Sequence, residues 1–189
     1  PASDFFKKIE KNQDQYKTWQ GELYLEKHQG TYTTQARNKK YNRKLELNLR
    51  ELEYASLLAS LYTEFNYPQT EIEELWKETL LYQFHDILPG SSIKRVYDES
   101  LKHYQKMLEK TIELKDRAYF RLIETINTDE TENTQFNYFV FNSLSWKRKE
   151  WIKLDDNWVY LEVPALSNRS FSVEINSENS KVDSKNDSE

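Results

Sequence analysis

Four residue types are rare or missing in this chain of 189 residues, which has no cysteine, one methionine, three glycines and four prolines. The absence of cysteine excludes disulfides, thiolate metal sites and a cysteine nucleophile, and it is typical of a reducing compartment, so we expect a cytoplasmic protein. No apolar run approaches the roughly 18 residues that cross a membrane, and no segment has the pattern of a signal peptide. We therefore expect no membrane partner.

A concentration of positive charge is also missing. The 27 Lys and Arg residues are outnumbered by 32 Asp and Glu residues, which gives a formal net charge of −5. Because no basic block could follow a phosphate backbone, nucleic acid is not an expected partner.

Glycine and proline are absent from Gln35 to Phe65, where apolar residues recur every three or four positions. This spacing predicts a long amphipathic helix. Its expected buried stripe consists of Tyr41, Leu45, Leu49, Leu52, Ala55, Ala59 and Tyr62.

The same periodicity predicts two further helices, at about 70–84 and 92–127, and a shorter one over 3–18. The expected stripes are Ile72, Leu75, Trp76, Thr79, Leu80 and Gln83 in the first and Ile93, Val96, Tyr97, Leu101, Tyr104, Leu108, Ile112, Tyr119, Leu122 and Ile126 in the second. Residues of the capping type predict helix starts, and they are Ser3, Thr70 with Glu73 as a capping box, and Ser91 or Ser92.

The pattern changes after the polar segment 129–134. Short aromatic and β-branched runs with partial alternation predict strands, at 136–141, 150–154, 158–163 and 169–175. So few strands cannot close a sandwich, and the polar segment 176–189 is expected to be disordered.

The predicted fold class is therefore mainly α: an antiparallel three-helix bundle followed by a truncated all-β segment. The expected organisation is a short helix and connector over 1–34, the bundle over 35–128, the start of a β-sandwich domain over 129–175, and a tail over 176–189.

The three glycines lie in two segments that ordinary bundle packing does not explain. The first reads GELYLEKHQGTYTTQ over 21–35 and is followed by Asn42 and Arg43 on the long helix, and the second reads QFHDILPGSSI over 83–93. Because glycine permits positive φ and close approach of backbone, specialised local structure is expected in both segments.

Taken in order, these two segments resemble those of the glycoside hydrolase family 38 α-mannosidases, and a motif this long is far more specific than a short pattern. FNSLSW over 141–146 and VPAL over 163–166 resemble the start of that family's C-terminal β region, so the resemblance covers about 18–175. Two positions depart from the family pattern: Gln29 stands where Arg is common, and Leu-Ser-Asn over 166–168 replaces a Gly-aromatic turn.

The resemblance implies retaining hydrolysis of α-mannosides, in which two carboxylates work through a covalent glycosyl-enzyme and a zinc ion positions the sugar hydroxyls. It implies His85 as one zinc ligand and Asp86 as a substrate-binding residue. The family's catalytic carboxylates belong to an N-terminal barrel, and no residue here matches them. We therefore expect an interior piece of such an enzyme, inactive alone, whose partners are the missing N-terminal barrel and C-terminal β domains of the same protein.

Without the resemblance, the residues leave other interpretations open. His85 follows a predicted helix, where the negative end of the dipole favours a cation, but a lone histidine there is more often a surface or capping residue. Asp86 is equally suited to a turn. A catalytic zinc needs about three protein ligands, and neither His28 nor His103 has ligand spacing to His85.

Two functions of other classes compete with the glycosidase. A non-catalytic helical interaction module with a β appendage would have the same helical pattern. A free-standing metal sensor is disfavoured, because the sequence offers too few ligands.

Overall fold

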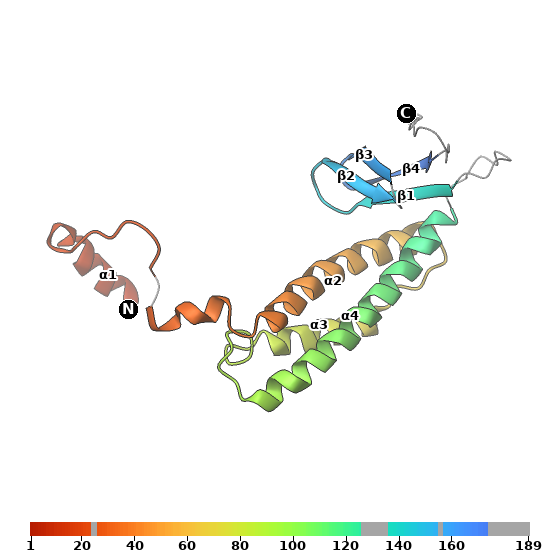
Figure 1. Ribbon diagram of the computed structural model, residues 1–189. Helices are drawn as coiled ribbons and strands as arrows, with labels where there is room; N and C mark the ends of the chain where they lie inside the picture. The colour runs from red at the N-terminus through yellow and green to blue at the C-terminus, as the bar shows by residue number, and fades with distance from the viewer. Residues whose placement is uncertain (24–25, 126–135, 155–156, 174–189) are drawn as a thin grey trace. The chain divides into compact units, whose positions relative to one another are not determined.

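The computed structural model describes residues 1–23, 26–125, 136–154 and 157–173, which are mainly helical with short antiparallel strands (Figure 1). This agrees with the predicted mainly α composition. By its contacts the chain divides into two compact units, 1–34 and 35–189. The predicted linker at 129–134 and the predicted tail at 176–189 lie outside the described residues. Among the described residues, no helix is both long enough and apolar enough to cross a membrane.

The first unit contains α1 (Ala2–Glu10), η1 (Gln13–Gln15) and η2 (Glu26–Tyr32). The helix expected over 3–18 therefore ends early. Its N-cap is Pro1, and no described side chain caps it, so the prediction of Ser3 as the cap is wrong.

The second unit contains three long helices, α2 (Ala36–Tyr62), α3 (Gln69–Tyr82) and α4 (Lys94–Ile123). Hydrogen bonds join Asn38 to Ser100 and Glu51 to Tyr119, so α2 and α4 run in the same direction. Hydrogen bonds also join Asn42 to Gln83 and Glu53 to Trp76, so α3 runs opposite to α2. The helices therefore alternate in direction along the chain.

The main hydrophobic core lies where these three helices meet. A fully buried leucine contributes roughly 1.5–3 kcal/mol relative to an exposed one, so burial of this set is what holds the helices together. The core residues are Leu45, Leu49 and Leu52 from α2, Ile72, Leu75 and Tyr82 from α3, and Tyr104, Met107 and Leu114 from α4.

The predicted stripes are correct for the leucines and alanines of α2 but only in part elsewhere. Tyr62, Leu80, Ile93 and Ile112 were placed in the stripes, yet all four are exposed. The buried face of α4 also includes small and polar residues, which the spacing of apolar residues does not predict. Its buried positions are Tyr97, Ser100, Tyr104, Met107, Thr111, Leu114, Ala118 and Leu122.

A second cluster of buried residues lies between α2 and α4 and contains no residue of α3, which has 14 residues against 27 and 30 in its neighbours. The buried members of this cluster are Ala55, Ala59, Ala118 and Leu122. Phe65, from the connection to α3, and Phe141, from the first strand, pack against it. The strand segment is thus joined to the helices by an aromatic contact.

Four strands form two antiparallel pairs: β1 (Phe136–Asn142) with β4 (Ser167–Val173), and β2 (Arg148–Leu154) with β3 (Asn157–Val163). In β3, alternate residues are buried, and they are Val159, Leu161 and Val163. The buried side chain of Asn142 donates to the carbonyl oxygens of Trp146 and Pro164 at 2.8 and 2.7 Å, which ties β1 to the segments around the hairpin.

Two predicted helix caps are also absent. The N-cap of α3 is Pro68 and that of α4 is Ile93, and no described side chain caps either helix, so the capping roles of Thr70, Ser91 and Ser92 are wrong. Before α4, the hydroxyl of Ser91 donates to the carbonyl oxygen of Asp86 at 3.4 Å, and the N–H of Ser92 donates to the hydroxyl of Tyr97 at 2.8 Å.

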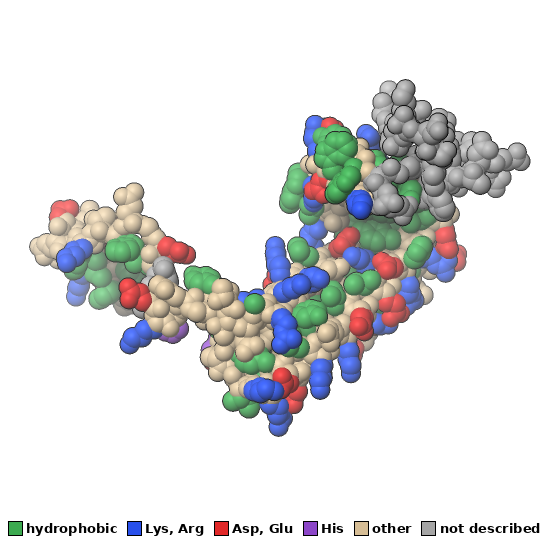
Figure 2. Space-filling model, in the orientation of Figure 1, with side chains coloured by type: hydrophobic (Ala, Val, Ile, Leu, Met, Phe, Trp, Pro, Cys, Tyr) green, Lys and Arg blue, Asp and Glu red, His purple; other side chains and the backbone are tan. Residues whose placement is uncertain are grey.

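Positive and negative side chains are interspersed along the helices on the face shown in Figure 2.

Candidate functional site

His85 and Asp86, the two predicted site residues, lie in the loop between α3 and α4. His85 Nε2 is 3.7 Å from Asp86 Oδ2, and their side chains are 78% and 56% exposed. The imidazole packs against the ring of Phe84, with ring centroids 4.2 Å apart. Both groups are therefore adjacent and accessible.

The loop follows a series of tight turns that its sequence favours. The N–H groups of Ile87 and Leu88 donate to the carbonyl of Phe84 at 2.9 and 3.1 Å, and that of Gly90 donates to the carbonyl of Ile87 at 3.2 Å. Gly90 has a φ of 106°, a conformation that side chains disfavour, so the loop requires the glycine that the motif carries.

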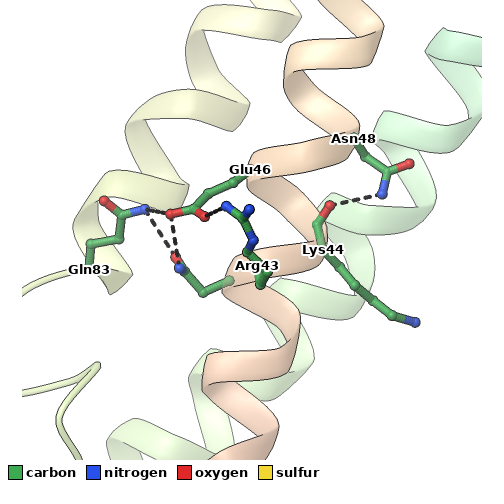
Figure 3. Close-up of polar contacts among 6 residues, drawn as sticks. Arg43, Lys44, Glu46, Asn48 and Gln83 are labelled. Carbon is green, nitrogen blue, oxygen red and sulfur yellow. Dashed lines mark hydrogen bonds and ion pairs between the residues drawn. The ribbon is translucent and has the colours of Figure 1, made fainter. Parts of the chain in front are cut away.

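A polar network fixes the end of α3, just before the loop, against α2 (Figure 3). Gln83 Nε2 donates to Asn42 Oδ1 at 3.1 Å and to Glu46 Oε1 at 2.9 Å. Glu46 also accepts from Asn42 Nδ2 at 3.2 Å and from Arg43 at 3.0 Å. The structure thus brings together Asn42 and Arg43 of the first motif with Gln83 of the second.

The main chain of the loop is held by two side chains that sequence reasoning did not assign to the site. Lys39 Nζ donates to the carbonyl oxygen of Leu88 at 2.8 Å, and burial lowers the pKa of Lys39. The hydroxyl of Tyr97 lies 3.3 Å from the carbonyl oxygens of both Asp86 and Ile87. Tyr97 was predicted as a core residue, which is correct for its ring, but periodicity carries no signal for the role of its hydroxyl.

The other two histidines lie on other elements than the loop that carries His85. His28 lies in η2, within the first unit. His103 is on α4, where its Nδ1 contacts Glu78 and its ring meets Tyr82 edge-on at 6.2 Å. Its side chain is exposed, but it also links α4 to α3.

A zinc ion fits these residues only in part. Among the residues that the structure describes, no group of three or more His, Cys, Asp or Glu side chains could hold a metal. His85 offers one accessible imidazole, which is the kind of ligand that zinc prefers, and the remaining ligands of a catalytic site have to come from elsewhere.

Comparison with known proteins gives matches over most of the chain. The family described as the α-mannosidase middle domain matches residues 26–122, about half of the chain. The human protein named alpha-mannosidase 2C1 is 38% identical over 146 residues, which cover 77% of this chain and 14% of that protein. Alpha-mannosidase G of Dictyostelium discoideum is 42% identical over 106 residues, or 56% of this chain and 10% of that protein.

Two solved structures share the fold. An α-mannosidase from Enterococcus faecalis V583 aligns with a TM-score of 0.60 and 22% identity over 65% of this chain and 14% of its own. A protein of glycosyl hydrolase family 38 from Enterococcus faecalis aligns with a TM-score of 0.61 and 21% identity over 80% of this chain and 18% of its own.

The chain thus spans only a small part of its relatives, 10% and 14% of the length of the two curated proteins. The matched range includes the polar network, the loop and the histidine at its corner. These matches confirm the predicted resemblance to the family 38 α-mannosidases, and the chain belongs to the α-mannosidase middle domain family.

Proposed function

We propose that this chain is the middle region of a retaining α-mannosidase that hydrolyses terminal α-mannosyl residues. In this proposal His85 supplies one zinc ligand and Asp86 contacts the substrate. The observation that carries it is the exposed pair of His85 and Asp86 on a loop fixed by two helices, within a range that the family matches. The small share of each relative that the chain spans is consistent with catalytic carboxylates elsewhere in the same protein.

The residues of this chain would perform two tasks. His85, as a neutral imidazole three residues beyond the last residue of α3, would hold the cation near the negative end of that helix's dipole. Asp86 would accept hydrogen bonds from sugar hydroxyls. Zinc, when bound, would polarise and position the oxygens of the sugar.

The finer domain assignment belongs to the same proposal. We infer that α2, α3 and α4 constitute a three-helix bundle domain and that β1 to β4 begin a larger β domain. Further partners would be an N-terminal barrel and the rest of the β domain. The cytoplasmic location stays a prediction.

Substitution of His85 in the full-length enzyme tests the proposal. His85→Ala should lower turnover of an aryl α-mannoside by at least about 100-fold and reduce zinc content, because it deletes a ligand. The circular dichroism of the helices should not change, since the side chain is exposed. His103→Ala is the matched control and should keep both zinc and turnover.

Asp86→Asn separates the two roles, because it keeps the size of the side chain but removes its charge. Turnover should fall severely while more zinc is retained than in His85→Ala. If His85→Ala has full zinc and wild-type turnover, the proposed roles of this loop are wrong, and the loop is a packing corner between two helices.

A further inference from the structure

We propose that Tyr97 is a positioning residue for the His85 loop. Its hydroxyl fixes the main chain of residues 86–92, so that the side chains of His85 and Asp86 are held outward in one direction. Lys39 supplies a second anchor. This inference rests on the proposed role of His85 as a metal ligand.

The hydroxyl of Tyr97 joins the two sides of the loop. It accepts the N–H of Ser92 at 2.8 Å, and it lies within donating distance, 3.3 Å, of the carbonyl oxygens of Asp86 and Ile87. Tyr97 is buried, with 5% of its surface exposed. Since water cannot easily replace a buried partner, loss of the hydroxyl would leave loop groups unsatisfied.

Lys39 anchors the main chain of the loop at the next residue, Leu88. Its ammonium group donates to the carbonyl oxygen of Leu88 at 2.8 Å. The carbonyl of residue 88 therefore accepts from α2, and the carbonyls of residues 86 and 87 share the single hydroxyl proton of Tyr97 on α4.

The side chains of the loop fall into two groups, packed and exposed. Ile87 packs against the main core cluster, whereas the side chains of His85 and Asp86 are exposed. A metal ligand has to stay within roughly 0.5 Å of its productive position, and a fixed main chain contributes to this precision without burying the ligand.

Tyr104 shows that packing alone does not require the hydroxyl. It lies about two turns further along α4 and is fully buried, but its hydroxyl has no hydrogen-bond partner among the described residues. A phenylalanine would fill that position equally well. At Tyr97, in contrast, the hydroxyl both accepts and donates.

The test compares Tyr97→Phe and Tyr104→Phe in the full-length enzyme, with zinc affinity measured by competition with a chelator. Tyr97→Phe should bind zinc about tenfold more weakly, the range expected when the support of a ligand is removed. Hydrogen exchange in residues 84–93 should be faster, and the helical circular dichroism should be unchanged. Tyr104→Phe should retain wild-type zinc affinity. Lys39→Met, a second variant, should shift affinity in the same direction as Tyr97→Phe.

The result for His85→Ala in the same assay separates this inference from the proposed function. If His85→Ala loses zinc while Tyr97→Phe and Lys39→Met both keep wild-type affinity, the positioning role is overturned and the proposed function stands. If His85→Ala keeps its zinc, His85 is no ligand and both are overturned.

Discussion

At the residue scale, a few buried polar atoms of the described helices have no hydrogen-bond partner. Among the described residues, Asn38 Nδ2, Ser56 Oγ and the hydroxyl of Tyr104 are buried without a hydrogen bond. An unsatisfied buried group of this kind costs about 1–3 kcal/mol. These positions are therefore where a conservative substitution can raise stability.

Tyr104→Phe should leave the free energy of unfolding unchanged or raise it by up to about 1 kcal/mol, since it deletes an unpartnered hydroxyl and keeps the ring. Urea denaturation at neutral pH measures this change. A clear loss of stability would show that the hydroxyl has a partner, such as a buried water.

The same residue predicts how stability depends on alkaline pH. Burial, with Tyr82 and Glu46 nearby, raises the pKa of the Tyr104 hydroxyl. The unfolded state then ionises first, so stability falls as pH rises above about 10, by up to about 1.4 kcal/mol per pH unit for each such group. Burial also raises the pKa of Tyr82, to about 12. Denaturation midpoints between pH 9 and 11 should fall less steeply in Tyr104→Phe than in the wild type, and an equal slope would contradict the assignment.

Leu166 has a φ of 47°, in the left-handed region that favours glycine. It occupies the turn before β4, where the family pattern has a glycine. Because this conformation costs a residue with a Cβ about 1–2 kcal/mol, Leu166→Gly should stabilise the chain. The flexibility of glycine in the unfolded state offsets part of that gain, so we expect about 0.5–1 kcal/mol. Thermal unfolding measures it, and a lower melting temperature would argue against strain at this turn.

At the element scale, the short length of α3 leaves a place for the strand segment. The second cluster contains no α3 residue, and the ring of Phe141 packs there against Tyr119 with centroids 4.6 Å apart. Arg50 of α2 adds a hydrogen bond to the carbonyl oxygen of Ser143 at 2.7 Å. The end of β1 is thus packed against the helices.

Phe141→Ala should destabilise the helices as well as the strands. Full burial would make the loss about 3–5 kcal/mol, and since Phe141 is only partly buried we expect roughly 2 kcal/mol. Chemical denaturation followed by helical circular dichroism measures this loss. Trp151→Ala is the control: it deletes an exposed aromatic side chain of β2, so the helical transition should hardly move. Equal effects of the two variants would show that the contact with the helices is not specific.

At the scale of the whole molecule, the proposed function requires zinc ligands beyond the residues that the structure describes. The described residues contain no cluster that could hold a metal, and the imidazole of His85 is largely exposed. The proposed zinc site, with further ligands from another domain, would account for both observations.

The isolated chain should therefore neither bind zinc tightly nor cleave aryl α-mannosides. Calorimetry with zinc should show no stoichiometric binding at submicromolar affinity, because one imidazole and one carboxylate do not complete a tetrahedral site. Stoichiometric binding at that affinity, or turnover above the blank, would contradict the proposal that the site is shared.

Much of the fold and the location of the site could be predicted from local patterns. The ranges of α2, α3 and α4 follow from periodicity because the apolar face of a helix repeats at 3.6 residues whatever its neighbours are. The position of the loop follows from Pro89 and Gly90, which end one helical pattern and permit the turn before the next. Helix caps were predicted less well, because residue type alone does not show which local group a serine will bond: Ser91 donates to the carbonyl oxygen of Asp86, and the N–H of Ser92 donates to Tyr97.

By itself, then, the sequence determined the helices, the family and the place of His85, since each depends on residues that are close in the chain. Only the tertiary structure decided which polar side chains support that histidine. Gln83 reaches Glu46, and Lys39 reaches Leu88, across 37 and 49 residues. Such pairs form because α2, α3 and α4 pack side by side, and no periodicity in one segment can show which side chain of another helix will meet it.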